Sequence, residues 1–197
     1  MKEIISESIL AGIFISIGGV AFLTVGGITG AILFTFGLAS IVCYQLYLFT
    51  GLSGFIDNIR QLWELFLVLV FNIVGCLFAS YAMSVSLPDL GNSAIDIVSK
   101  RVDMGALNVF ILAIFCGFIM TTVVTFARKK QWIPLLLGIP LFIMCGFVHS
   151  IADAFYYGLA MFSGYEMKWC NGLMYLMAVV GNFVGCNLYR LVMLKIE

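Results

Sequence analysis

Long runs without a charged side chain divide the sequence into apolar segments. The longest run covers residues 8–56, and the others cover residues 65–88, 104–127, 131–152 and 169–189. A helix that spans a membrane needs ~20 apolar residues, so each of the four shorter runs fits one span. The longest run has room for two spans joined by a turn.

This pattern predicts an all-α, polytopic membrane protein with six transmembrane helices. Gly26, Gly27 and Gly30 indicate the turn that divides the first run. We expect one transmembrane channel domain over residues 1–197, with a first half of about 1–90 and a second half of about 104–197. The predicted spans cover about residues 8–26, 29–56, 63–87, 105–127, 132–157 and 172–193.

A short motif occurs twice in the chain. The sequence Asn-x-Val-Gly-Cys appears at residues 72–76 and again at residues 182–186, each time in the third span of its half. Because three spans is an odd number, the two halves must run through the membrane in opposite directions, as in the inverted repeats of many transporters and channels. The alternative is a chance recurrence, since small-residue patterns are common where membrane helices pack.

The second span of each half contains residues that interrupt an apolar helix. Residues 43–54 combine polar side chains with two glycines, and the fifth span contains Pro134, Pro140 and Gly146. Interrupted helices at corresponding positions in two halves indicate a transport site. Irregular backbone at membrane depth must be buried in protein or line a cavity. We therefore expect helices 2 and 5 to be broken beside a pathway.

His149 is the single histidine of the chain, and it lies in the fifth predicted span with Asp153 four residues later. An ionisable residue inside a membrane is a functional candidate, and histidine exchanges protons near neutral pH. The alternative is a buried histidine that joins two helices. Its position at the predicted break favours the functional interpretation.

The composition excludes several classes of protein. Hydrophobic residues make up 63%, only 10% of residues are charged, and the net charge is zero. So few charges cannot cover a soluble enzyme, and no basic surface indicates nucleic-acid binding. Five of the six cysteines fall in predicted spans, and no Cys/His cluster occurs, so we expect no disulfide framework, no metal site and no cofactor.

The positive charges predict the orientation in the membrane. Lys and Arg are more frequent in cytoplasmic loops, so the richer side is expected to be cytoplasmic and to hold both termini. Residues 93–103 have the pattern of an amphipathic helix at the membrane surface. The predicted cytoplasmic residues are Lys2, Arg60, Arg128, Lys129, Lys130, Arg190 and Lys195, and those on the other side are Lys100, Arg101 and Lys168.

Three motifs in this order resemble the formate/nitrite transporter family of pentameric anion channels. They are Leu48-Phe49-Thr50 after Gly37-Leu38, the segment 146–152 around the histidine, and Gly181-Asn182. The resemblance covers the whole chain. It implies an aquaporin-like inverted 3+3 repeat with broken helices 2 and 5, assembled as a homopentamer in a bacterial-type inner membrane.

The resemblance also implies two apolar constrictions along the pore. Leu38 matches the apolar residue of the cytoplasmic constriction, and Phe34 lies one turn before it. Leu48 and Phe142 match the pair that closes the periplasmic side. These four assignments follow from the family pattern alone.

Between the constrictions, the resemblance implies a polar centre. His149 matches the central histidine, Thr50 the hydroxyl residue that faces it, and Asn182 a polar residue near the pore. The segment Tyr44–Gly51 matches a mobile gating loop. Basic residues at the mouth can gather anions, and Lys100 and Arg101 are the candidates, with solvated loop charges as the alternative.

Four positions depart from the family pattern. Tyr47 and Val148 occupy positions that are usually acidic, and Thr121 and Asp153 occupy positions where asparagine is frequent. The vestibule lysine has no secure match. Thr121 and Asp153 are retained as candidate pore or vestibule residues, and the departures leave the substrate open.

The predicted function is a membrane channel for small monovalent anions or their weak acids, of the formate, nitrite or hydrosulfide type. Two apolar constrictions oppose a bare anion, because removing its water is costly, while a neutral acid crosses more easily. The alternatives are a proton-coupled carrier of a small monocarboxylate and a neutral-solute channel of the same fold; the paired Asn-Pro-Ala motifs of aquaporins are absent. An intramembrane enzyme is disfavoured because no carboxylate pair or metal-ligand spacing is present.

Overall fold

The computed structural model describes residues 1–192, and Lys195 of the orientation argument lies outside the described residues. Within this part of the chain the regular structure is entirely helical. The elements are α1 (Lys2–Val25), α2 (Gly27–Cys43), α3 (Phe49–Leu52), the 3-10 turn η1 (Ser53–Phe55), α4 (Ile59–Ser86), α5 (Leu90–Met104), α6 (Ala106–Arg128), α7 (Ile133–Met144), α8 (Ser150–Phe162) and α9 (Trp169–Val192).

Four of these helices, α1, α4, α6 and α9, are long and apolar enough to cross a membrane. Helices α2 and α7 are apolar but shorter. Many large apolar side chains on α2, α4 and α7 remain exposed on the single chain, including Phe36, Phe78 and Leu137. Such surfaces suit lipid or a neighbouring subunit rather than water.

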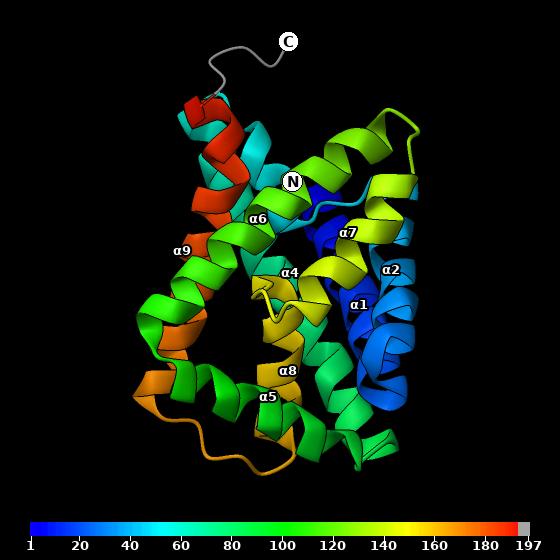
Figure 1. Cartoon of the computed structure of the whole chain (residues 1–197), viewed down its shortest axis with the longest axis vertical. Helices are drawn as coiled ribbons and strands as arrows, with labels where there is room; N and C mark the ends of the chain where they lie inside the picture. Colours follow the sequence, from blue (N-terminus) through cyan, green and yellow to red (C-terminus); the bar gives the residue numbers. More distant parts are fainter. Residues whose placement is uncertain (193–197) are drawn as a thin grey trace.

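The long helices pack in two corresponding groups. Helix α1 packs against α2 and α4, and α6 packs against α7 and α9. Figure 1 shows α1 and α2 along one edge and α6 crossing α9 toward the other. A side chain at Gly12 would collide with the backbone carbonyl of Asn72, and one at Gly117 with that of Asn182. Both glycines thus permit the close approach of their helix to a partner.

Each group contains a helix that stops partway through the molecule. Helix α2 ends at Cys43, and a new helix begins only at Phe49; helix α7 ends at Met144, and α8 begins at Ser150. Both stops contain a left-handed residue, Gln45 with φ 56° and Gly146 with φ 71°. This conformation is typical of helix C-termini, where the chain turns away from the helix axis.

The predicted surface helix over residues 93–103 corresponds to α5. This helix carries apolar residues on one face and packs against α8. In Figure 1 it lies across the end of the molecule opposite to the C-terminal end of α9. It therefore covers the end of the molecule toward which α8 runs.

Candidate functional site

His149 lies at the start of α8, where the chain is extended after the stop of α7. Its backbone has φ −106° and ψ 111°, and its Nδ1 atom accepts a hydrogen bond of 3.1 Å from the backbone N–H of Ala152. The imidazole thus caps the first turn of α8, where backbone N–H groups lack helical partners. Because Nδ1 is an acceptor, the proton of the neutral ring resides on Nε2.

The Nε2 atom of His149 is 3.0 Å from Oγ1 of Thr50, at the start of α3. Both side chains are buried. With Nε2–H donating to Thr50, the threonine hydroxyl hydrogen remains available for another acceptor. The predicted pairing of these two residues is therefore present, and it joins segments 99 positions apart in sequence.

Two asparagines hold the extended segments that precede α3 and α8. Asn72 Oδ1 accepts from the N–H of Phe49, and its Nδ2 donates to the carbonyls of Tyr47 and Ser8. The bonds to Phe49 and Tyr47 satisfy backbone groups that no helix satisfies, and the bond to Ser8 joins this segment to α1. Asn72 therefore fixes the chain immediately before Thr50.

Asn182 makes the corresponding bonds in the second half. Its Oδ1 accepts from the N–H of Ser150, and its Nδ2 donates to the carbonyls of Val148 and Ala113. Backbone groups occupy all the hydrogen-bonding positions of the Asn182 amide. Asn182 therefore positions the segment that carries His149 and has no free donor or acceptor for a substrate. Sequence reasoning assigned Asn182 to the pore and gave Asn72 no role, although the repeated motif contains both.

The cysteines of the repeated motif connect the two halves. Cys76 Sγ lies 3.4 Å from the carbonyls of Gly12 and Ile151, and Cys186 Sγ lies 3.3 Å from the carbonyls of Gly117 and Thr50. Each thiol thus reaches the interrupted segment of the opposite half. Both thiols therefore pack closely against the segments that carry His149 and Thr50.

Two cavities approach the His149–Thr50 pair from opposite ends. The first, of about 690 Å³, is lined by Leu38 and Leu48 and by Arg128 and Lys130 at its outer part. It opens where α2 ends and α7 begins. Gly51, next to Thr50, also lines this cavity.

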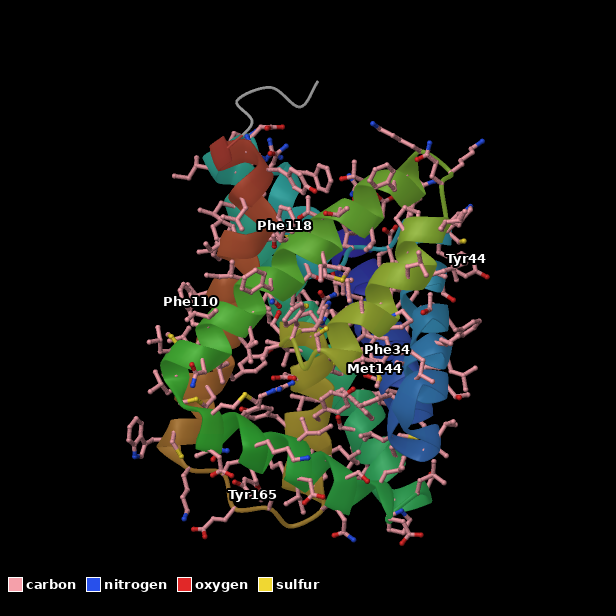
Figure 2. The ribbon with its side chains drawn as sticks, in the orientation of Figure 1. Phe34, Tyr44, Phe110, Phe118, Met144 and Tyr165 are labelled. Atoms are coloured by element: carbon pink, nitrogen blue, oxygen red, sulfur yellow. The ribbon has the colours of Figure 1, made fainter. Side chains whose placement is uncertain are left out.

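The second cavity, of about 370 Å³, is lined by Phe34, Phe142 and His149, with Lys100 and Arg101 from α5. The ring centroids of Phe34 and Phe142 are 6.2 Å apart in an edge-to-face arrangement, and Phe142 stacks on the imidazole of His149 at 5.7 Å. Figure 2 shows Phe34 between α2 and α7. Phe142 thus contacts both Phe34 and the histidine in this wall.

The structure separates one pair of the four apolar candidates. Leu48 and Phe142 were expected together, yet Leu48 lines the first cavity with Leu38 and Phe142 lines the second. Phe34 lies one turn before Leu38 in α2, as expected, and contacts Phe142. The reason is the direction of the chain: after α2 stops, the segment before Thr50 returns beside the last turns of α2. Leu48 therefore reaches the Leu38 level, one turn beyond Phe34.

The remaining polar candidates divide into two groups. Asp153 lines the second cavity and binds the guanidinium of Arg101, a pair that sequence reasoning missed. Thr121 donates to the carbonyl of Cys186 and joins α6 to α9. Thr121 lines neither of these two cavities.

Taken together, these features define a class of protein: a multi-pass membrane protein with a buried polar pair between two cavities. The sequence profile of the formate/nitrite transporter family matches residues 1–194. The chain belongs to the formate/nitrite transporter family.

Two solved structures have a similar fold. One is described as a pentameric formate channel with formate bound; it has a TM-score of 0.77 and 20% sequence identity, and the match covers 98% of this chain and 95% of that one. The other is described as an FNT family ion channel, with a TM-score of 0.84 and 17% identity, covering 94% of this chain and 86% of that one. No curated protein sequence matches the chain. The proteins of this family are channels and transporters.

Proposed function

We propose that the protein is a channel that passes small monovalent anions of the formate type as their weak acids. The observation that carries this proposal is the buried contact of 3.0 Å between His149 Nε2 and Thr50 Oγ1, located between two cavities. The path runs from the first cavity past Leu38 and Leu48 to this pair. It continues past Phe34 and Phe142 into the second cavity.

The proposed architecture has six membrane crossings in two inverted halves. Helix α2 with α3 and η1 forms the second crossing, and α7 with α8 forms the fifth. The corresponding bonds of Asn72 and Asn182 support the repeat. The protein forms a homopentamer in an inner membrane with both termini cytoplasmic; the formate channel of similar fold, described as pentameric, supports the assembly.

The polar centre has the groups needed to protonate an anion. The anion accepts the Thr50 hydroxyl proton, Thr50 takes the Nε2 proton of His149, and a hydronium ion that enters from the same side as the anion returns a proton to Nε2 and leaves water. Each passage thus moves one anion and one proton together as the neutral acid. The apolar side chains on both sides then oppose the neutral acid less than the anion.

Flux into proteoliposomes tests this function. Formate, nitrite, hydrosulfide, acetate and lactate are offered across a pH series, and flux of the preferred substrate is expected to rise as pH falls. His149→Phe and Thr50→Val are expected to remove this dependence, while Thr50→Ser keeps it. Thr125→Val is the matched control, because its hydroxyl binds only within α6. Undiminished flux through His149→Phe at every pH contradicts the proton relay.

The same experiment separates the channel from a proton-coupled carrier. A carrier uses the same histidine but accumulates substrate against its own gradient when a proton gradient is imposed. A channel of the proposed kind only equilibrates the acid. Flux of water or uncharged solutes without flux of weak acids identifies the neutral-solute alternative.

A further inference from the structure

The two residues of the buried polar pair belong to helices of different length. His149 precedes α8, which extends from Ser150 to Phe162 over 13 residues. Thr50 belongs to α3, which has four residues and continues only as the three-residue turn η1. A helical segment this short pairs few of its own backbone groups and is not stable alone. The position of the Thr50 hydroxyl therefore depends on contacts with other elements.

Asn187 of α9 makes one of these contacts. Its Nδ2 atom donates to the carbonyl of Ser53 at 2.9 Å and to the carbonyl of Phe183, in its own helix, at 2.8 Å. Ser53 is fully buried, and its Oγ donates to the carbonyl of Phe49 at 2.6 Å. Phe49 and Ser53 flank the turn that carries Thr50. A chain of side-chain hydrogen bonds thus runs from α9 through η1 to the start of α3.

Gly54 allows η1 to lie directly against α9. A Cβ at this position would be 2.7 Å from the carbonyl oxygen of Cys186, closer than such atoms approach each other. The Cys186 thiol in turn contacts the carbonyl of Thr50 at 3.3 Å. Cys186 and its neighbour Asn187 therefore contact the two ends of the turn that carries Thr50.

The other half of the repeat has no amide at the corresponding position. The motif at residues 72–76 matches that at residues 182–186, so Asn187 corresponds to Leu77 of α4. Helix α8 is held by its own backbone bonds and by a bond from Ser80 of α4 to the carbonyl of Phe155. The amide thus occurs in the half whose helix is short, where it compensates for the missing helical turns.

We propose that Asn187 is a positioning residue for the Thr50 hydroxyl. The inference rests on the proposed proton relay, in which this hydroxyl passes the proton of His149 to the anion. Asn187 lines neither cavity of the pathway, so its effect on flux passes through η1 and α3. Without the Ser53 bond, the turn is free to shift, and the 3.0 Å contact between Thr50 and His149 lengthens. Proton transfer falls steeply with such a displacement.

NMR of the imidazole tests the positioning directly. His149 is the single histidine, so isotopic labelling of histidine in untagged protein gives the nitrogen signals of this ring alone. Asn187→Leu removes the amide donor at similar volume, and it is expected to shift the Nε2 signal toward that of Thr50→Val. Asn108→Leu is the matched control, since the exposed Asn108 binds only the Met104 carbonyl of the preceding turn. An Nε2 signal unchanged in Asn187→Leu overturns the proposal.

A second variant keeps the test decisive if Asn187→Leu does not fold. Ser53→Ala removes only the bond from Oγ to the Phe49 carbonyl, within the same chain of bonds. It is expected to shift the Nε2 signal of His149 in the same direction as Thr50→Val, by a smaller amount. In that case an unshifted signal in Ser53→Ala overturns the proposal.

Proteoliposome flux of the preferred weak acid across a pH series tests the consequence. Asn187→Leu is expected to reduce the rise in flux at low pH about tenfold, because the relay geometry is lost. In a Thr50→Val background it is expected to cause no further loss, because no hydroxyl remains to be positioned. Equal fold losses in both backgrounds indicate a general structural role and overturn the proposal. The titratable residues that line the second cavity with His149 are unchanged in these variants: Lys100, Arg101, Cys145, Asp153 and Tyr156.

His149→Phe separates this inference from the proposed function. If His149→Phe removes the pH dependence while Asn187→Leu keeps it in full, the relay stands and the positioning role fails. If His149→Phe itself keeps the pH dependence, the relay fails and the positioning role fails with it.

Discussion

Arg101 and Asp153 form a two-point ion pair that joins α5 to the first turn of α8. Arg101 Nε is 3.1 Å from Oδ2, and Nη2 is 3.2 Å from Oδ1. The two side chains are 12% and 2% exposed. Because Asp153 follows His149 by one helical turn and its N–H donates to the His149 carbonyl, the pair also fixes the turn that carries the histidine.

Removing one member of this pair is expected to destabilise the protein more than removing both. Asp153→Asn or Arg101→Gln alone leaves a buried charge without its partner, at a cost of about 3–5 kcal/mol in unfolding free energy. The double variant is expected to cost clearly less than the sum. Unfolding in mixed micelles measures the cycle, with the exposed Lys100→Gln as control. Additive losses from the two substitutions contradict the prediction.

The two asparagine clamps are expected to be equally important for stability. Asn72→Leu and Asn182→Leu each leave one N–H and one carbonyl of non-helical backbone without partners, at a cost of ~2 kcal/mol or more. The thermal unfolding midpoint in detergent measures the loss. Asn108→Leu is the matched control, since Asn108 is exposed and binds only the Met104 carbonyl of the preceding turn. A midpoint equal to that of this control contradicts the clamp.

Gln45 and Gly146 occupy equivalent left-handed positions but differ in residue type. A left-handed residue with a Cβ costs ~1–2 kcal/mol relative to its usual conformation, and glycine avoids this cost. Gln45→Gly is therefore expected to raise stability, and Gly146→Ala to lower it, by about 1 kcal/mol each. No atom lies within 4 Å of a Cβ at Gly146, so the loss measures backbone conformation alone. Stability changes of the same sign in both variants contradict this account.

The helices were predictable from the sequence because lipid imposes a simple requirement on it. A membrane span needs a run of apolar residues, and the four helices long enough to cross a membrane, α1, α4, α6 and α9, each overlap with one charge-free run. Helices α2 and α7 end close to the glycine and polar residues that interrupt the apolar pattern. The contact of His149 with Thr50 followed from the family motifs rather than from spacing.

The pairing of side chains across the cavities was not predictable in the same way. Arg101 and Asp153 are 52 residues apart, and no periodicity relates a surface helix to the first turn of α8. The position of Leu48 along the axis of α2, relative to Phe34, depends on how far the chain runs back beside α2 after that helix ends. The hydrogen bonds of Asn72 to Tyr47 and Phe49 set that distance, and the sequence does not predict these bonds.

Double substitutions along the pathway test which apolar residues form one barrier. Phe34 contacts Phe142, so Phe34→Leu and Phe142→Leu are each expected to raise the flux of lactate relative to formate, and the second substitution to add little. Leu38→Ala is expected to multiply the effect of Phe34→Leu, because Leu38 lines the first cavity whereas Phe34 lines the second. Proteoliposome flux of both acids at one pH provides the ratios. Independent effects of Phe34→Leu and Phe142→Leu on the flux ratio would contradict the single barrier that these two side chains are expected to form.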